Sequence, residues 1–543
     1  MTPEIHTGTL ADVHTGELKR AAIRVENGRI TAIEPSDDVA PGVIMPGFVD
    51  AHVHIESSML TPAAFARTAV CHGTVATVSD PHEIANVLGL KGLEYMLDSA
   101  AGAPMHIAFG VPSCVPATPF ESAGAVLGPD EVEALLDDER FTYLSEVMNW
   151  PGVISEDPDV HAKIDAARRR GKPIDGHAPL VTGEALRKYA AAGITTDHEC
   201  TSEAEAREKL ALGLRIAIRE GSAARNFEAL ADLIGVFPGQ VMFCSDDKHP
   251  DELLAGHIDR LAARAVAGGL PWQLVLRVAC VTPVAHYTLP VGLLRVGDRA
   301  DFIRVSGLED FEVRETWIEG RCVARAGQAL FDVGTADAPN RFLPPVVTAG
   351  DFAIRAEGSL VRAIRAIDGS LVTGEEFVPV RLDGRLAVAD PSNDLLKIVV
   401  VNRYAPSPPA VGFIRGFGLR AGAIASSVAH DSHNIVAVGA DDDSLACAVR
   451  ALGRSRGGLA VVAGPDERVM PLPVAGLMTT GSCEEAALAY SALDAAAKAL
   501  GCPLRAPFMT LSFMALLVIP SLKLGDRGLF DGRNFEFVPV FAD

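Results

Sequence analysis

The stretch Met45-Pro-Gly-Phe-Val-Asp-Ala-His-Val-His54 decides how the rest of the chain is interpreted. Residues 43–49 are apolar and β-branched enough to predict a buried strand, and the Pro-Gly pair inside them indicates a kink near its start. His52 and His54 follow at positions i and i+2, so both imidazoles point to the same side of a strand. Two imidazoles that converge at a strand end are half of a metal site, and other strands must supply the remaining ligands. The alternative is a chance pair of histidines.

Composition excludes several classes of protein. The chain has 543 residues, which is too long for one hydrophobic core and suggests about three domains. Its net charge of −22 argues against nucleic acid and anionic membranes as partners, because both need basic patches. Nine cysteines without a Cys-x-x-Cys pair indicate the reduced thiols of a cytoplasmic protein. The N-terminus has no signal-peptide pattern, and the broken apolar run 508–519 is shorter than the ~20 residues of a membrane span.

Both flanks of a central region predict short β-strands. Residues 1–45 alternate apolar and polar side chains around the hairpin signal Asn27-Gly28. This unit is too small to hold a core alone, so we expect it to join residues 290–335 in one discontinuous β-sandwich domain. After a proline-rich junction, residues 340–543 mix alternating and helical patterns and predict an additional α+β domain.

Strand and helix patterns alternate through the central region, residues 46–289. The predicted strands start at residue 43 and continue at 74–79, 105–111, 141–146, 173–177, 194–198, 215–219 and 241–246, with helices between them that include 83–101, 155–170 and 222–235. Eight repeats over about 250 residues are the signature of a (β/α)8 barrel. Periodicity alone leaves a doubly wound open sheet as the competing architecture.

Polar residues interrupt these strands at their carboxyl ends, where the active site of a barrel lies. They are His52, His54, Glu146, His177, His198 and the pair Asp246-Asp247. A buried charge is costly unless it is paired or metal-bound. Four imidazoles and two or three carboxylates exceed one tetrahedral site and suit two metals that share a carboxylate. Histidine and carboxylate without cysteine favour Zn(II), Mn(II) or Fe(II) and do not choose among them.

Each of these residues also has an ordinary structural explanation. A strand-end histidine is often a hydrogen-bonded core residue, Glu146 suits a salt bridge, and Asp246-Asp247 suits a helix cap. Their joint position on one rim favours the metal site. Two metals that share a water lower its pKa toward neutrality, and Asp246 is the expected proton relay because it ends the last strand beside His52 and His54. The residues alone leave open whether an amide, an ester or an amidine C–N bond is cut.

In these motifs the sequence resembles the amidohydrolase superfamily. The resemblance covers about residues 1–330 and includes Val25-Glu-Asn-Gly-Arg-Ile30, the Pro46–His54 stretch, Asp175-Gly-His177, Asp197-His198-Glu199, Cys244-Ser-Asp-Asp247 and the exit Gly292–Asp301.

Within the superfamily the sequence is similar to the adenine deaminases. The matching stretches are Ile55–Met59, Asp80-Pro-His-Glu-Ile-Ala-Asn86, Val111–Thr118, Arg219–Arg225, Ser245–Pro250, His430-Asp-Ser-His-Asn434 and Met470–Met478. Many superfamily members bridge their metals with a carboxylated lysine on the fourth strand. Here Glu146 occupies that position, which resembles the adenine deaminase pattern.

The resemblance implies a distorted (β/α)8 TIM barrel in which a hydroxide bridging two metals attacks C6 of adenine and releases ammonia and hypoxanthine. The metals would be Mn(II) or Fe(II), with Zn(II) as the alternative. His52, His54 and Asp246 would hold one ion and His177 and His198 the other, with Glu146 between them. Asp246, Glu146 and His198 are the expected catalytic residues. A large acidic cytoplasmic enzyme of this kind is also expected to form a homo-oligomer, a dimer or higher, while its net charge argues against nucleic acid as a partner. The other deaminase architecture, His-x-Glu with a downstream Pro-Cys-x-x-Cys, is absent from the sequence.

Three further pairs are candidates for substrate contact. His82 and Glu83 follow the second strand, although Asp-Pro-His-Glu is also an ordinary helix start. Glu220 and Ser222 follow the seventh strand, where a helix cap is the alternative. His430 and His433 lie far along the chain in a polar loop, and we expect the C-terminal region to fold this loop onto the barrel mouth, against the alternative of a solvated loop.

Two other functions compete with adenine deamination. One is another amidohydrolase that acts on a related nucleobase or a cyclic amide. The other is a non-catalytic binding protein on the same fold, which predicts lost metal ligands, and no ligand position of the motif is lost here.

Overall fold

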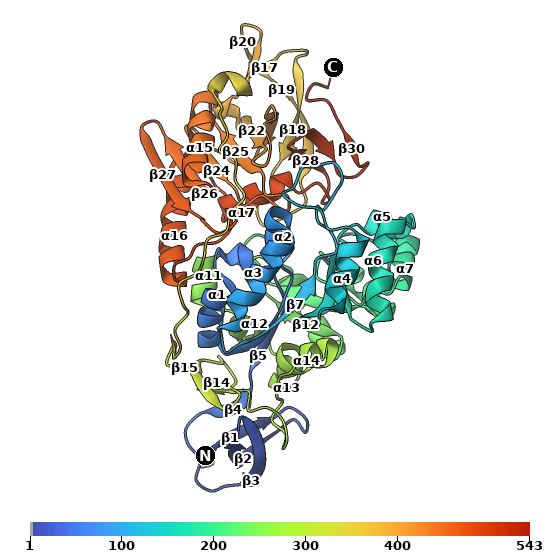
Figure 1. Cartoon of the computed structure of the whole chain (residues 1–543), viewed down its shortest axis with the longest axis vertical. Coiled ribbons are helices and arrows are strands. Elements are labelled where there is room, and N and C mark those ends of the chain that lie inside the picture. Colours follow the sequence, from blue (N-terminus) through green and yellow to red (C-terminus); the bar gives the residue numbers. More distant parts are fainter. Residues whose placement is uncertain (1–3, 543) are drawn as a thin grey trace.

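A tight turn at Asn27-Gly28 organises the first part of the chain, which we describe over residues 4–542 in a computed structural model. Both turn residues have positive φ (52° and 74°), and they join two antiparallel strands as the sequence predicts. Strands from both flanks of the barrel complete one sheet at one end of the molecule (Figure 1). In sheet order the strands are β16 (Gln328–Ala329), β15 (Arg321–Arg325), β14 (Val313–Ile318), β13 (Phe302–Val305), β4 (Val43–Pro46), β1 (Glu4–Asp12), β2 (Glu17–Glu26) and β3 (Arg29–Pro35).

The chain passes from this sheet into the barrel at Gly47. The prediction of a single strand over residues 43–49 is wrong, because β4 ends at Pro46 in the flanking sheet and β5 (Phe48–Val53) begins the barrel. A Cβ atom at Gly47 would lie 2.2 Å from Cγ1 of Val75, so only glycine permits this close approach.

Eight parallel strands form the predicted barrel. They are β5, β6 (Thr74–Ser79), β7 (His106–Val111), β8 (Phe141–Val147), β9 (Ile174–Gly176), β10 (Thr196–Asp197), β11 (Arg215–Arg219) and β12 (Val241–Cys244). They pair as groups of five and three, β5 to β9 and β10 to β12. The Thr195 N–H donates to the Ile174 carbonyl at 2.8 Å, and the Asp246 N–H donates to the His52 carbonyl at 2.9 Å. These two bonds join the groups, so the sheet closes and the doubly wound alternative is excluded.

Helices cover the outside of the barrel. Two predicted helices are interrupted: residues 83–101 form two helices that meet at Gly89, whose φ is +61°, and residues 222–235 form a loop followed by two short helices. The helices are α1 (Pro62–Ala69), α2 (His82–Leu88), α3 (Leu90–Ala101), α4 (Pro129–Asp137), α5 (Trp150–Ile154), α6 (Pro158–Arg169), α7 (Gly183–Ala191), α8 (Glu203–Ala211), α9 (Phe227–Leu230), α10 (Leu233–Val236), α11 (Pro250–Ala255), α12 (Ile258–Ala267), α13 (Trp272–Leu276) and α14 (Thr282–Tyr287).

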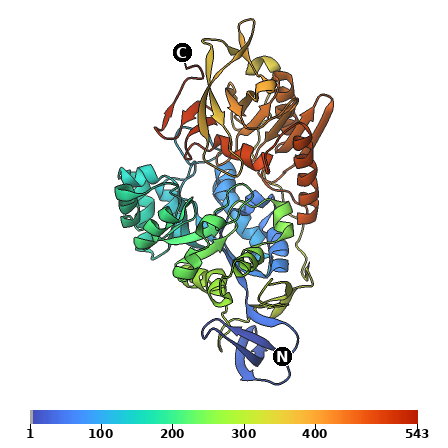
Figure 2. The same cartoon turned by 180° about the vertical axis from the view of Figure 1, so that it is seen from behind.

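The C-terminal part of the chain lies at the opposite end of the barrel from the flanking sheet (Figures 1 and 2). Its main sheet runs β19 (Gly374–Pro379), β18 (Leu360–Arg365), β23 (Ala410–Arg415), β22 (Leu396–Val401), β25 (Ile435–Gly439), β24 (Ala423–Ser426), β26 (Gly458–Ala463) and β27 (Asp466–Pro471). Three helices accompany it: α15 (Asp442–Ser455), α16 (Cys483–Ala499) and α17 (Pro507–Ser512). This α+β composition agrees with the prediction. The domain boundaries 1–45 with 290–335, 46–289 and 340–543 stay predictions.

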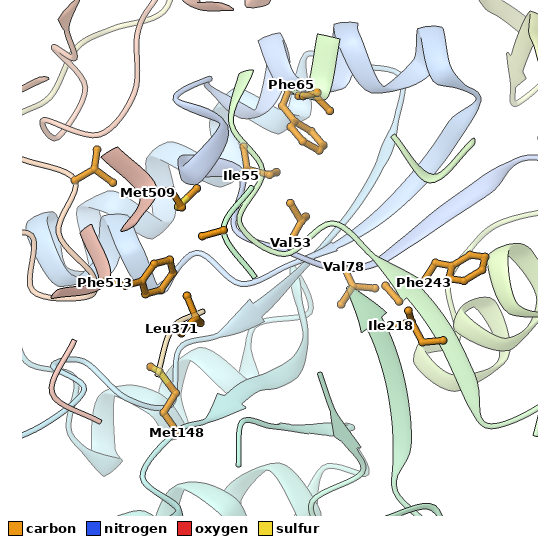
Figure 3. Packing of buried hydrophobic residues seen from close by; sticks show 14 of the residues in the cluster. Val53, Ile55, Phe65, Val78, Met148, Ile218, Phe243, Leu371, Met509 and Phe513 are labelled. Carbon is orange, nitrogen blue, oxygen red and sulfur yellow. The ribbon is translucent and has the colours of Figure 1, made fainter. Parts of the chain in front are cut away.

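The hydrophobic core is continuous from the barrel into the C-terminal region. Barrel residues such as Val53 and Val78 belong to the same buried cluster as Met509 and Phe513 (Figure 3). The apolar run 508–519 is buried here, and it forms most of α17, a 3-10 turn that ends at Ala515 and a short irregular segment. No described helix combines the length and the apolar character that crossing a membrane requires. The shared core fixes the C-terminal region over the carboxyl ends of the barrel strands.

Candidate metal centre

The carboxyl ends of β5 and β12 bring three predicted ligands together. The Nε2 atoms of His52 and His54 lie 3.2 Å apart. Oδ1 of Asp246 is 3.6 Å from the first of these nitrogens and 3.3 Å from the second. All three side chains are at most 3% exposed. Three ligand atoms therefore converge on one buried point.

Glu146, near the end of β8, lies between this group and two further histidines. Its Oε2 atom is 2.8 Å from Nδ1 of His177 and 3.2 Å from Nε2 of His198. Its Oε1 atom is 3.3 Å from Nε2 of His54. One carboxylate thus faces both halves of the site, which is the arrangement that a shared ligand requires.

The chemistry of this set fits divalent metal ions. The imidazole nitrogens of His52 and His54 face each other and a carboxylate, and Nε2 of His177 is buried without a hydrogen-bond partner. Buried electron-pair donors that face one another are costly unless a cation lies among them. Imidazole and carboxylate are ligands for Zn(II), Mn(II) and Fe(II).

Both carboxylates of the site are held in the charged form. Burial alone would raise the pKa of Glu146, but the neighbouring imidazoles, His177 first among them, hold it well below its ordinary value. Burial is likewise outweighed at Asp246, whose pKa is held well below the ordinary value by Arg219 and then by His52 and His54. Ionised carboxylates are the form that coordinates a metal.

Three residues of the site were not predicted. Oδ2 of Asp80 lies 3.0 Å from Nδ1 of His82, and Oε1 of Glu199 lies 3.5 Å from Nε2 of His198. Arg219 donates to Glu199 and to Oδ2 of Asp246, at 2.5 Å for the second. Their sequence signals were their positions, since each ends a barrel strand or follows one within two residues inside a quoted motif. Arg219 therefore orients two acidic groups of the centre.

A second polar cluster joins the barrel to the C-terminal region. Nδ1 of His430 and Nε2 of His433 both donate to the Glu83 carboxylate. Nδ1 of His433 accepts the Ala429 N–H at 3.1 Å, which leaves the proton on Nε2. Although burial opposes it, these imidazoles hold the pKa of Glu83 well below its ordinary value. The expected folding of the loop 430–434 onto the barrel mouth is therefore observed.

His82 connects the two clusters. Its Nδ1 atom is 3.5 Å from Oε1 of Glu146. Its Nε2 atom is 3.4 Å from Oε1 of Glu83 and 3.6 Å from Oδ1 of Asp431. Asp431 is a further residue that sequence reasoning did not single out.

A cavity separates the barrel rim from the C-terminal region, and we call it the inner cavity. Its lining comprises His54, His82, Glu83, Glu146, Met148, His177, His198, Glu199, Asp246, Asp247, Leu371, His430, Asp431, Phe513 and Leu516. The Phe513 ring stacks on the His430 ring with centroids 4.3 Å apart. The roof of the inner cavity is thus built by C-terminal residues and its floor by the barrel.

Glu220 and Ser222 do not line the inner cavity. The Glu220 carboxylate lies 2.9 Å from Nη1 of Arg264, and the Ser222 hydroxyl donates to Glu252 at 2.9 Å. The loop that replaces the start of the predicted helix turns both side chains toward these partners. Asp247, in contrast, lines the cavity and accepts a hydrogen bond from the Ser57 hydroxyl.

Comparison with known proteins agrees with this geometry. The sequence model of the Amidohydrolase family matches residues 43–323, and that of the Adenine deaminase C-terminal domain matches residues 370–536. A protein of Salinibacter ruber named adenine deaminase is 55% identical over 538 residues, covering 99% of this chain and 98% of its own. One of Methanosarcina mazei with the same name is 50% identical over 551 residues, covering 99% of both chains. The chain belongs to the adenine deaminase family of amidohydrolases.

The family assignment confirms the resemblance seen in the motifs. The matched C-terminal segment contains the roof residues Leu371, His430 and Phe513, so the two family models together include both walls of the inner cavity. Amidohydrolase membership and the buried clusters of His, Asp and Glu together indicate that the centre binds divalent metal.

Glu121 offers a test of the electrostatics at the roof. Its carboxylate accepts the Ser432 hydroxyl at 2.7 Å, and burial raises its pKa to about 8. Unfolding at neutral pH therefore releases a proton, and the stability contribution of Glu121 falls as pH rises from 4.5 to 8, by at most about 1.4 kcal/mol per pH unit.

We expect Glu121→Gln to remove this pH dependence. Between pH 6 and 8, the midpoint of thermal unfolding should fall more in the wild type than in the variant. Glu133→Gln, at a surface ion pair with Arg169, is the control and should follow the wild type. If the unfolding midpoints of Glu121→Gln and wild type differ by the same amount at pH 6 and at pH 8, Glu121 is not protonated in the folded protein at neutral pH.

Proposed function

We propose that this protein is an adenine deaminase, which hydrolyses adenine to hypoxanthine and ammonia. Identity of about half the residues over the whole length of proteins with that name is the observation that carries the proposal. The predicted ligands His52, His54, Glu146, His177, His198 and Asp246 all lie at the barrel rim, at most 5% exposed, which supports it.

The six rim residues would hold two divalent ions, Mn(II) or Fe(II), with Zn(II) as the alternative. His52, His54 and Asp246 would bind one ion, His177 and His198 the other, and Glu146 both. Ions bound here would lower the pKa of water so that it attacks near neutral pH. Glu146 and His198, which both line the inner cavity, would act in catalysis as ligands of these ions.

Asp246 is the proposed proton carrier. As water adds to C6 of adenine, its proton passes to Oδ1 of Asp246 and then to N6. The C6–N6 bond breaks, ammonia leaves, and the oxygen stays on C6. Arg219 holds the other oxygen, Oδ2, at 2.5 Å, so the accepting oxygen is kept facing the site.

The second cluster is proposed to bind the purine. Glu83, His82 and His430 line the inner cavity and offer both acceptors and donors to the nitrogen-rich ring. His433 does not line it but donates to Glu83, so we assign it a positioning role. Glu220 and Ser222 receive no role with substrate, because their partners are Arg264 and Glu252.

Release of ammonia tests this function. The protein reconstituted with Fe(II) or Mn(II) under reducing conditions should release ammonia from adenine and not from cytosine, guanine or hydantoin. Removing the metal with a chelator should abolish the activity, and restoring either ion should recover it. Activity on a cyclic amide alone would favour another amidohydrolase, and a purified protein that binds no transition metal would favour the non-catalytic scaffold.

We also propose a cytoplasmic homo-oligomer. All nine cysteines are free, which suits a reducing compartment. Size-exclusion chromatography with light scattering measures the assembly directly.

A further inference from the structure

The inner cavity needs a way in for substrate. Its free volume is about 20 Å³, which is room for roughly one water molecule. A purine therefore fits only after part of the wall moves. Two larger cavities, one beside Tyr95 and one beside Tyr287, share no lining residue with the inner cavity.

A second cavity lies directly against the inner one, and we call it the outer cavity. It is lined by Pro179, Glu199, Cys200, Thr201, Arg219, Ala224, Arg225, Asn226, Gly369, Ser370, Leu371, Val372 and Ile519. Its volume is about 220 Å³. Thr201, Arg225 and Gly369 on its rim are exposed, whereas Cys200 and Ile519 are 1% exposed. The outer cavity thus leads from the surface toward the centre.

The two cavities share the residues Glu199 and Leu371. Glu199 is fixed, because Arg219 donates to both of its carboxylate oxygens. Leu371 is the apolar member of the wall and lies with Met148 and Phe513 around the inner cavity (Figure 3). Of the two shared residues, Leu371 is therefore the one whose side chain forms no hydrogen bond or ion pair.

The backbone of Leu371 is held from inside. Nζ of Lys523 donates to the Leu371 carbonyl at 2.8 Å and to the Phe513 carbonyl at 2.9 Å, and the lysine is fully buried. The bond to Leu371 anchors its main chain, whereas its apolar side chain, which is 6% exposed, is held by packing alone.

Charge in the outer cavity indicates an uncharged ligand. Arg219 is paired with Glu199 and Asp246, and Arg225 is paired with Glu252 at 2.5 Å. Both lining arginines already have carboxylate partners, so neither is available to bind a phosphate. The outer cavity therefore suits a free nucleobase better than a nucleotide.

We propose that the outer cavity receives the purine base first, and that the Leu371 side chain is the gate through which the base passes to the metal centre. The proposal deepens the proposed function and rests on it. Lys523 acts as a positioning residue that keeps the gate at the shared wall.

A planar chelator tests the gate without reference to adenine. We expect 1,10-phenanthroline to remove Fe(II) from Leu371→Ala about tenfold faster than from wild type, and from Leu371→Trp about tenfold more slowly. Leu516 lines the inner cavity only, so Leu516→Ala is the matched control and should release metal at the wild-type rate. Equal rates in all four proteins, with unchanged unfolding midpoints, overturn the gate.

A second experiment tests the proposal by blocking the outer cavity. Ser370→Cys labelled with a bulky maleimide should lower kcat/KM for adenine at least about tenfold and slow loss of Fe(II) to the chelator. Ser392→Cys, at an exposed surface site, and the wild type receive the same reagent as controls for the native thiols. If labelled Ser370→Cys keeps wild-type kcat/KM and chelation rate, the route is wrong. If only the chelation rate changes and adenine is not deaminated by any of the proteins, the proposed function fails while the route stands.

Discussion

Glu146→Gln is expected to lower kcat/KM for adenine by at least about a thousandfold, equivalent to about 4 kcal/mol of transition-state stabilisation. The glutamine keeps the shape of the side chain but loses the charge that faces His54, His177 and His198. Without this charge the proposed shared ligand of both ions would be lost, so we also expect fewer than two metal ions per chain. Steady-state kinetics and elemental analysis of the purified variant measure both effects.

Glu121→Gln is the matched control for this experiment. Glu121 is also a buried glutamate near the roof, but its pKa of about 8 keeps it largely protonated at pH 7. An amide is a close substitute for a neutral carboxyl group, so we expect activity within about threefold of wild type. Full activity and full metal content in Glu146→Gln would show that this carboxylate is no shared ligand.

Asp246→Asn should reduce kcat by about a thousandfold, because the amide accepts no proton from the attacking water. Asp247→Asn tests the neighbouring carboxylate in the same cavity. Asp247 is bonded to the Ser57 hydroxyl and lies 3.9 Å from Nε2 of His430, whereas His52 and His54 face Oδ1 of Asp246, so the loss should be much smaller. Both kcat and metal content are to be measured. If both variants lose the same fraction of kcat, the proton is carried by Asp247 or by Asp246 and Asp247 together.

The barrel and the flanking hairpins could be predicted from sequence because their signals are local. Alternating strand and helix patterns give eight repeats, and Asn27-Gly28 fixes a hairpin through its positive φ angles. The interruptions of predicted elements at Gly47 and Gly89 could not be predicted from the sequence. Gly47 separates two sheets only because Val75 packs against it, and Gly89 interrupts a periodic pattern that continues on both sides. Each depends on contacts far away in sequence.

The residues of the candidate site also fall into those that the sequence predicts and those that it does not. The six predicted ligands stand out as polar residues at the ends of buried strands, which is a pattern that sequence alone displays. Asp80, Glu199 and Arg219 occupy similar positions but become significant only through distances to other loops. Glu220 has the same sequence signal as these residues, yet its side chain turns to Arg264. Position on the rim can be predicted, whereas the direction of a side chain in a loop cannot.

The division of the inner cavity between two stretches of chain has an evolutionary consequence. All six proposed ligands lie between residues 52 and 246, whereas the roof is contributed by residues 371 to 516. The proposed metal ligands are therefore encoded in one part of the gene, whereas the proposed purine site draws on both parts. Recombination or mutation in the later part can change which heterocycle is admitted while leaving the inherited cation-holding floor intact.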